Sequence, residues 1–299
     1  MQFQRSQSFP GIVVHGENRS LNTNIQAFLV LNSQVKSDIG DIILTSQAGW
    51  TRFTTEVSAS EIQGTGLLPG QINTDNAAQI ATNQNFAETT EIGFAAQQEA
   101  NWEDRIIATV GARYDRSTLN LDQDEYTLYP KASLAVNIAN FDFWDIDQVN
   151  LLKLRAAYGE TGGVPLFGNT FTTLGTGPIG DRVGAIAPVS SVDPDLKPER
   201  AKEIEAGLDL GFYDGRLTFE GTYYNKTVED LILDLAPSPA TGLTTGITTN
   251  AAELENIGWE FGLTASPIRT SNFSWNSNVL WWTNKSEITK LVIPAQTKH

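Results

Sequence analysis

Catalytic chemistry has few side chains to draw on in this chain of 299 residues. The sequence contains two histidines, His15 and His299, one near each end, and no cysteine. A Ser-His-Asp triad or a histidine metal cluster needs such groups side by side, and without thiols there are no thiolate ligands, disulfides or cysteine nucleophiles. We therefore expect no catalytic residue, no metal site and no cofactor, and we predict that the protein is not an enzyme.

Paired carboxylates are the remaining candidates for acid–base chemistry. Glu203 and Glu205 are two positions apart, so they share one face of a β-strand, and in a soluble fold such a pair would suggest glycoside hydrolysis. We interpret them instead as part of a polar, water-facing wall. The acidic segment 121–126 (LDQDEY) offers oxygen ligands for calcium without EF-hand spacing, so calcium binding stays an alternative there. The glycine-rich segment 175–180 (GTGPIG) lacks a phosphate-loop pattern.

Both glutamates belong to a segment in which apolar and polar residues alternate. Along 201–212 (AKEIEAGLDLGF), every second residue from Ile204 to Phe212 is apolar and the residues between are charged or glycine. The same period of two recurs in 106–114, 149–158 and 256–265. Many such segments exceed about ten residues, which is roughly what a tilted strand needs to cross a bilayer. The pattern predicts an all-β fold, an antiparallel up-and-down transmembrane β-barrel, although a soluble sandwich or solenoid also alternates.

Connections between these segments alternate in length. Short turns are expected at 31–41, 101–104, 139–148, 213–216 and 266–272, and long loops at 58–88, 115–126, 161–199 and 234–250. Short periplasmic turns and long outer loops are typical of membrane barrels, and this alternation predicts about ten long strands. Aromatic residues beside the short turns predict a periplasmic girdle, namely Trp102, Trp144, Phe212, Tyr213, Phe273 and Trp275.

Ten strands with short turns on the periplasmic side place both chain ends outside the cell. The first strand is expected from Asn22 to Leu31 and the last from Asn272 to about Ile288. Complete barrels ordinarily begin and end in the periplasm, and the N-terminus shows no secretory signal. We therefore interpret residues 1–299 as an internal part of a larger barrel domain, an incomplete barrel without a plug domain.

Charge and hydropathy argue against two other classes of protein, namely nucleic-acid-binding proteins and proteins that span a membrane with helices. The net charge of −15, from 35 acidic and 20 basic residues, disfavours a nucleic-acid partner. The longest apolar run, from Ala27 to Leu31, is far shorter than the ~20 residues of a membrane-spanning helix. If the protein spans a membrane, it does so with strands.

The segment from Asp193 to Ile232 resembles the barrel of SusC/RagA-like TonB-dependent outer-membrane receptors, which usually carry Asn where this chain has Asp193. A second match is the N-x-G-x-E pattern that begins one strand, and the resemblance covers roughly 91–290. Prolines in the first motif cannot donate ladder hydrogen bonds, so they hold an extended loop. We interpret Glu199 and Arg200 as a solvated charge pair, with hydrogen bonding at the barrel rim as the alternative. We expect structural roles for the motif residues Pro194, Asp195, Leu196, Lys197, Pro198, Glu199, Asn256, Gly258 and Glu260.

The resemblance implies a barrel of about twenty-two strands around a plug in the cell outer membrane. It further implies contact with outer-membrane lipid, coupling to TonB, a SusD-like surface lipoprotein as lid, and an oligosaccharide or peptide substrate. We therefore expect a fragment of an active nutrient importer. A passive porin-like barrel and a secreted, soluble β-rich glycan-binding module remain alternatives. The substrate-binding residues are unknown, and the loops 166–182 and 235–249 are the expected places of ligand contact.

Overall fold

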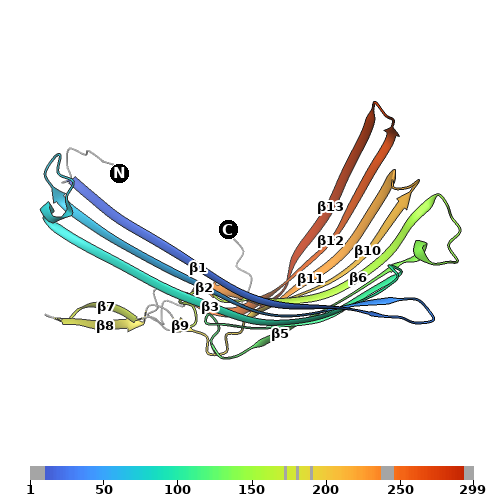
Figure 1. Ribbon diagram of the computed structural model, residues 1–299. Coiled ribbons are helices and arrows are strands. Elements are labelled where there is room, and N and C mark those ends of the chain that lie inside the picture. Colours follow the sequence, from blue (N-terminus) through green and yellow to red (C-terminus); the bar gives the residue numbers. More distant parts are fainter. Residues whose placement is uncertain (1–10, 172–173, 180–181, 189–190, 237–245, 293–299) are drawn as a thin grey trace. The chain divides into compact units, whose positions relative to one another are not determined.

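The computed structural model describes residues 11–171, 174–179, 182–188, 191–236 and 246–292 (Figure 1). Ten long strands dominate this part of the chain, with two three-residue 3-10 helices, η1 (Thr74–Asn76) and η2 (Ile138–Asn140). No helix of the described residues is long and apolar enough to cross a membrane. The long strands are β1 (Gly11–Val35), β2 (Ile42–Leu67), β3 (Gln79–Trp102), β4 (Ile106–Ser117), β5 (Thr127–Asn137), β6 (Val149–Gly163), β10 (Glu199–Phe212), β11 (Leu217–Leu235), β12 (Ile247–Arg269) and β13 (Ser274–Leu291).

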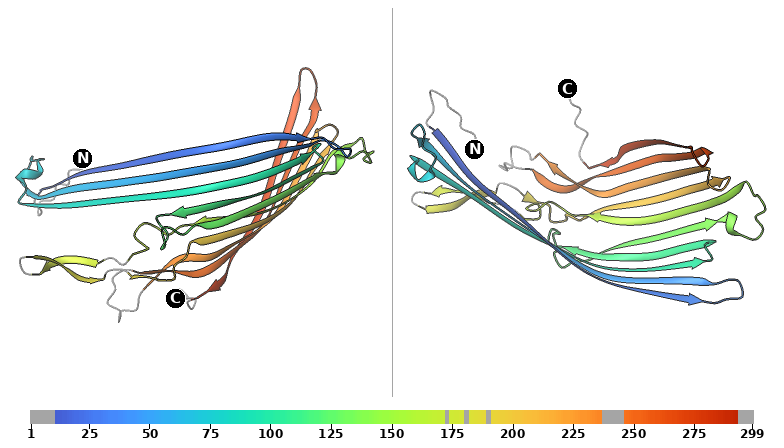
Figure 2. Two further views of the ribbon diagram at one scale, coloured as in Figure 1. Left: turned by 60° about the horizontal axis from the view of Figure 1, so that its bottom comes forward. Right: turned by 45° about the horizontal axis from the view of Figure 1, so that its top comes forward.

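The long strands follow one another in a single sheet, in the order β1-β2-β3-β4-β5-β6-β10-β11-β12-β13. The ladders from β4 to β13 are antiparallel, and neighbouring strands run side by side in all views (Figures 1 and 2). This order confirms the predicted ten up-and-down strands in a sheet that does not close within the described residues. The described residues also contain three strands that were not predicted, all inside the expected loop 161–199. They are β7 (Leu174–Ile179) and β8 (Arg182–Pro188), which form a separate two-stranded sheet, and β9 (Ser191–Val192), which pairs with β12.

The expected loop 58–88 is mostly strand. β2 continues to Leu67 and β3 begins at Gln79, so only 68–78 connects them. The prediction was wrong because this stretch is polar on both faces and shows no hydrophobic alternation. A strand can form without that pattern if a neighbouring strand supplies hydrogen-bond partners for its backbone N–H and C=O groups. The outer strands are also longer than expected, since β1 begins at Gly11 and β13 ends at Leu291.

The chain divides into two compact units. The first contains residues 11–25 and 51–92 of the described chain and has a small apolar centre, where Val13 and Leu67 are 6% and 3% exposed. Side-chain hydroxyl groups link its strands. The hydroxyl oxygens of Thr54 on β2 and Thr90 on β3 lie 3.1 Å apart, and the Thr55 hydroxyl donates to the side-chain oxygen of Asn22 on β1 at 2.9 Å. The second unit contains residues 26–50 and the described residues from 93 onward, and it carries every motif singled out in the sequence.

In the second unit, strand register separates an apolar face from a polar face. Across β6, β10 and β11, Leu154 lies opposite Leu208, and Leu210 lies opposite Phe219. On the other face, Lys153 lies opposite Asp209, which lies opposite Glu220. The predicted alternation is therefore confirmed.

Apolar side chains on the first of these faces lack cover. Ile204 is 58% exposed, Val279 59% and Trp281 55%. Rings on β11, β12 and β13 form a continuous surface, with Phe261 stacked against Phe219 at 5.9 Å and against Trp281 at 5.4 Å. A soluble monomer rarely exposes a contiguous apolar area of this kind, which favours contact with lipid.

The short turns are tied to one another by aromatic and charged side chains. The Trp102 indole donates to the carbonyl of Ile39 at 2.9 Å, and its ring meets Phe141 edge to face at 5.9 Å. The Arg105 guanidinium lies 5.7 Å from both ring centres and pairs with Asp142 at 2.6 Å. The three turns that contain Ile39, Arg105 and Phe141 are therefore joined to one another through Trp102 and Arg105.

Candidate functional site

The Pro194–Glu199 motif begins with a tight turn. The backbone N–H of Leu196 donates to the carbonyl of Asp193 at 3.1 Å, and the N–H of Asp195 donates to the Asp193 carboxylate at 2.9 Å. Proline at 194 suits the second position of such a turn, because its fixed φ matches and no N–H is needed there. The turn presents Leu196 inward, where it is 4% exposed, while the Pro194, Asp195 and Lys197 side chains remain exposed.

Asn250 of β12 makes three hydrogen bonds, two to Lys197 just after this turn and one to Asp230 of β11. Its amide nitrogen donates to the carbonyls of Lys197 at 2.9 Å and Asp230 at 2.6 Å, and its oxygen accepts from the Lys197 N–H at 2.8 Å. The neighbouring Thr249 hydroxyl donates to the Asp193 carboxylate. We call residues 193–199 together with Asn250 the clasp, since they fasten the connection between β6 and β10 to the end of β12.

Glu199 completes the clasp at an irregularity of β11. The β11–β12 register shifts on both sides of Leu231, next to Asp230, which has φ +55°. The Glu199 carboxylate accepts from the Ile232 N–H at 2.8 Å and so supplies a partner for a donor in this irregular stretch. The residue paired with Glu199 on β6 is Gly163, where a β-carbon would lie 2.7 Å from the carboxylate.

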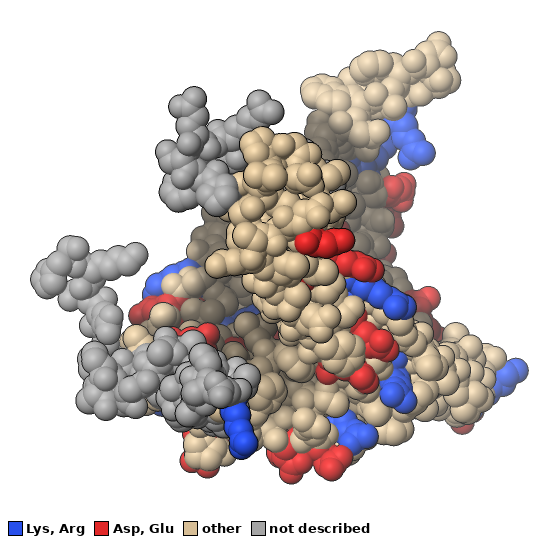
Figure 3. Space-filling view, turned by 90° about the vertical axis from the view of Figure 1, so that its left-hand side faces the viewer, with Lys and Arg blue, Asp and Glu red and all other residues tan. Residues whose placement is uncertain are grey.

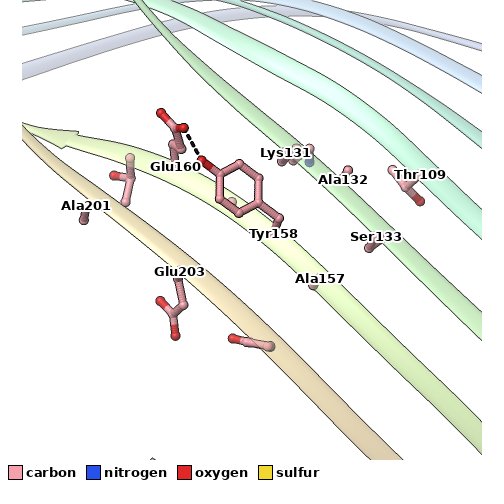
Figure 4. Close-up of a pocket in the computed structure, with 12 residues that line it drawn as sticks. Thr109, Lys131, Ala132, Ser133, Ala157, Tyr158, Glu160, Ala201 and Glu203 are labelled. Atoms are coloured by element: carbon pink, nitrogen blue, oxygen red, sulfur yellow. Dashed lines mark hydrogen bonds between the residues drawn. The ribbon is translucent and has the colours of Figure 1, made fainter. Parts of the chain in front are cut away.

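Arg200, next in sequence, belongs to a separate network. Its guanidinium pairs with Glu160 and donates to the Leu128 carbonyl at 2.9 Å, and the Tyr158 hydroxyl also donates to Glu160 (Figure 4). The interpretation of Glu199 and Arg200 as a solvated charge pair is therefore wrong. The two side chains have different partners because successive residues of a strand point to opposite faces. Acidic and basic side chains also lie next to one another on the side of the molecule drawn in Figure 3.

The N-x-G-x-E residues occupy one face of β12. Asn256 accepts a hydrogen bond from the Ser286 hydroxyl of β13. At Gly258, a β-carbon would lie 2.4 Å from Cζ of Tyr224 and 2.5 Å from the Thr283 carbonyl oxygen. The glycine thus leaves room for a ring that reaches across from β11. Glu260 is exposed and lies opposite Trp282.

Glu203 and Glu205 lie on the polar face, as expected. They line an open groove of about 360 Å³ with Thr109, Lys131 and Ser133 of the neighbouring strands (Figure 4). Nearby, Arg155 bonds Asp209 at 3.0 Å and the Thr222 hydroxyl at 2.8 Å. In the part of the chain that the structure describes, no group of three or more His, Cys, Asp or Glu side chains is placed to hold a metal ion.

The expected ligand loops are described only in part. Residues 172–173 and 180–181 of the first loop and 237–245 of the second lie outside the described residues. The described end of the second loop, Ile247–Thr249, belongs to β12 and supports the clasp rather than an open binding surface. Sequence reasoning missed Asn250, Asp230 and Gly163, because no local pattern reports partners as far apart in sequence as Asn250 and Lys197.

A pH-dependent contribution is expected from Asp193. Hydrogen bonds from the Thr249 hydroxyl and from the Asp195 N–H lower the pKa of its carboxyl below the ordinary value of 3.8. A lowered folded-state pKa stabilises the folded state fully above that ordinary value, and the contribution is lost as pH falls through the lowered pKa. Replacing Asp193 with alanine should therefore cost on the order of 1 kcal/mol at neutral pH and less at strongly acidic pH.

The Asp193→Asn variant is the matched control for this effect. The two hydrogen bonds go to different carboxylate oxygens. In Asp193→Asn the amide oxygen keeps the bond from the Asp195 N–H, and the amide NH2 donates to the Thr249 hydroxyl oxygen, so this variant should be close to wild type at neutral pH and should show no titration. Urea unfolding of the full-length protein in detergent, measured from pH 7 to acid, gives the free energy of unfolding of both variants at each pH. A loss in Asp193→Ala that does not change with pH would contradict the assignment.

A family model described as "TonB dependent receptor-like, beta-barrel" matches residues 2–292. The TonB-dependent receptor P26 of Formosa agariphila is 29% identical over 97% of this chain and 31% of its own length. The TonB-dependent receptor SusC of Bacteroides thetaiotaomicron is 30% identical over 62% of this chain and 20% of its own length. The chain thus spans a third or less of these relatives.

Solved structures agree on the fold. The structure described as the RagAB peptide transporter superimposes with a TM-score of 0.85 at 17% identity, covering 94% of this chain and 32% of that one. The outer membrane transporter YddB of Escherichia coli has a TM-score of 0.58 at 12% identity, covering 93% of this chain and 34% of that one. At these identities the similarity establishes the architecture alone.

Proposed function

Since the chain belongs to the TonB-dependent receptor-like β-barrel family, as the match over residues 2–292 establishes, we propose that it forms part of the wall of an active outer-membrane importer. The apolar face of the ten strands contacts lipid, and the polar face lines the path of the substrate. The cargo is an oligosaccharide or a peptide. The residues described here provide wall and loops, and they carry out no chemical conversion.

The observation that carries this proposal is the two-faced sheet. In β4, β5, β6, β10 and β12, the exposed residues Val110, Leu134, Leu154, Ile204 and Trp259 share one face of the sheet, and Lys131, Glu205 and Asp209 share the other. A water-filled, polar interior behind a lipid-facing apolar band is the arrangement that transport through a barrel requires. The soluble-module alternative would leave the ring surface around Phe261 and Trp281 in water, which disfavours it.

Partners follow from the same proposal. An importer of this family draws energy through TonB, and the similarity to SusC and to the RagAB transporter supports a SusD-like surface lipoprotein as a lid. The clasp suits such an assembly, because it holds one end of a long connection in a fixed place.

The complete receptor tests the proposal in its own host. A tagged copy should be recovered in the outer-membrane fraction, and cells that lack the receptor should lose uptake of one class of oligosaccharide or peptide. Removing TonB should abolish that uptake to the same extent. Uptake that persists without TonB would indicate a passive porin-like barrel, and recovery in the soluble fraction would exclude both transport mechanisms.

A further inference from the structure

A groove on the polar face of the second unit keeps opposite charges apart. Lys131 of β5 and Glu203 of β10 both line it, and they lie opposite Gly159 of β6 from its two sides. Because neighbouring strands are about 4.8 Å apart, the backbones that carry the two charges are separated by about 10 Å. Figure 4 shows the two residues on the strands that flank β6. The groove therefore has a cationic wall and an anionic wall.

Small residues occupy the space between the two walls. Strand β6 contributes Ala157 and Gly159 to the groove, and a β-carbon at Gly159 would meet nothing within 4 Å. The groove has a volume of about 360 Å³, at the low end of the roughly 300–1,000 Å³ of small-molecule sites. There is thus room for a small guest directly between Lys131 and Glu203.

The next row of residues adds polar groups to both walls. Glu205 of β10 lies opposite Ala157, which lies opposite Ser133 of β5, and Ser133 lies opposite Thr109 of β4. One wall therefore offers two carboxylates, which bind an ammonium group. The other wall offers an ammonium group and two hydroxyls, which bind a carboxylate.

The charges of the groove are not neutralised within the described residues. None of the ion pairs or side-chain hydrogen bonds there involves the lysine or the two glutamates that line the groove. Lys226 of β11 lies opposite Glu203 but makes no ion pair with it. On the same face, by contrast, Arg155 and Asp209 are bonded to each other at 3.0 Å. The groove thus leaves three charges available to a ligand.

We propose that this groove binds a short peptide with both ends free, which names the cargo class of the importer proposed above and rests on that function. The ammonium end pairs with Glu203 and Glu205, and the carboxylate end pairs with Lys131. Two or three extended residues span about 7 to 10 Å, which matches the separation of the walls. A neutral oligosaccharide has no opposite charges at its two ends, so it would neutralise neither wall.

Three forms of tri-alanine test the proposal in the purified full-length receptor, with binding measured by calorimetry. The free peptide carries both end charges, the acetylated form lacks the ammonium group, and the amidated form lacks the carboxylate. We expect the free peptide to bind about tenfold more tightly than either blocked form, the effect of one hydrogen-bonded contact between charged groups. Equal binding of the three forms would overturn the proposal.

Substitutions in the walls assign each end of the peptide. Lys131→Met should weaken binding of free tri-alanine about tenfold and leave binding of the amidated form unchanged, because that form has no carboxylate to lose. The double variant Glu203→Gln/Glu205→Gln should weaken binding of the free form but not of the acetylated one. Lys153→Met and Glu220→Gln change the same face outside the groove and should bind tri-alanine like the wild type. A wall variant that affects free and blocked peptides equally would contradict the assignment.

Other occupants of the groove give different results. If Lys131→Met lowers the urea midpoint of the peptide-free receptor more than Lys153→Met does, the groove holds another segment of the receptor and the proposal is wrong. If the neutral trisaccharide raffinose binds the receptor and loses affinity in the wall variants, the groove takes a sugar and the proposal is also wrong.

Failure of this inference differs from failure of the proposed function. If uptake depends on TonB but tri-alanine does not bind, the importer stands and the assignment of the groove is wrong. If the receptor is absent from the outer membrane, the importer itself is wrong, whatever the peptide result.

Discussion

Replacing Gly258 with alanine is expected to destabilise the sheet by about 3 kcal/mol, at the upper end of the cost of overpacking. The added methyl group would meet the Tyr224 ring at 2.4 Å and the Thr283 carbonyl oxygen at 2.5 Å. A side chain can move aside, but the carbonyl belongs to the β12–β13 ladder. The whole edge of the sheet must therefore shift, which the urea midpoint of the full-length receptor would report.

Gly159 is the matched control, because a β-carbon there would meet nothing within 4 Å. Gly159→Ala should change stability by no more than about 0.5 kcal/mol. Adding Tyr224→Ala to Gly258→Ala should recover part of the loss, since it removes one of the two contacts. Equal effects of the two glycine substitutions would show that steric crowding at Gly258 is not what selects glycine.

Replacing Asn250 with alanine is expected to cost about 3 kcal/mol, since three hydrogen bonds of about 1 kcal/mol each disappear at once. Two backbone groups of Lys197 and the carbonyl of Asp230 lose their partner. The free connection should then become sensitive to protease between β6 and β10. Limited proteolysis and urea unfolding of the full-length receptor measure the two effects.

Two controls separate this effect from the loss of any asparagine. Asn225→Ala removes one side-chain bond, to Glu255 at 3.1 Å, and should cost about 1 kcal/mol without exposing the connection. Asn250→Asp keeps the acceptor for Lys197 but sets a carboxylate against two carbonyls, so it should be no more stable than Asn250→Ala. If Asn250→Asp retained full stability, the two donor bonds would have no role.

The ten long strands and their faces were predictable because alternation is local. In the segment from Ile204 to Phe212, the pattern alone assigns each residue to a face, and the register of β10 confirms it. The parts of β2 and β3 that lie next to the connection 68–78 were not predictable in this way. Ser58 and its neighbours are polar on both faces, so the strand there rests on backbone pairing that no side-chain pattern reports.

The clasp was predictable only as a motif. Sequence resemblance singles out Pro194–Glu199 but cannot show what the segment binds, because Asn250 is 53 residues away from Lys197 and Ile232 is 33 residues away from Glu199. Side-chain partners at such separations are set by the register of β10, β11 and β12. The strands β7 and β8 were missed for a different reason, since their glycines and prolines favour loop assignments.

The clasp also has a consequence for the order of assembly. Lys197 and Glu199 find their partners only after the β10–β11 and β11–β12 hairpins have brought Asn250 and Ile232 to the same place. Hairpins close early because their ends are near in sequence, whereas a contact across 53 residues waits for them. We infer that the clasp is absent from the folding transition state. Variants of the clasp should then leave the folding rate almost unchanged and accelerate unfolding. The clasp therefore prolongs the lifetime of the native state without helping it to form.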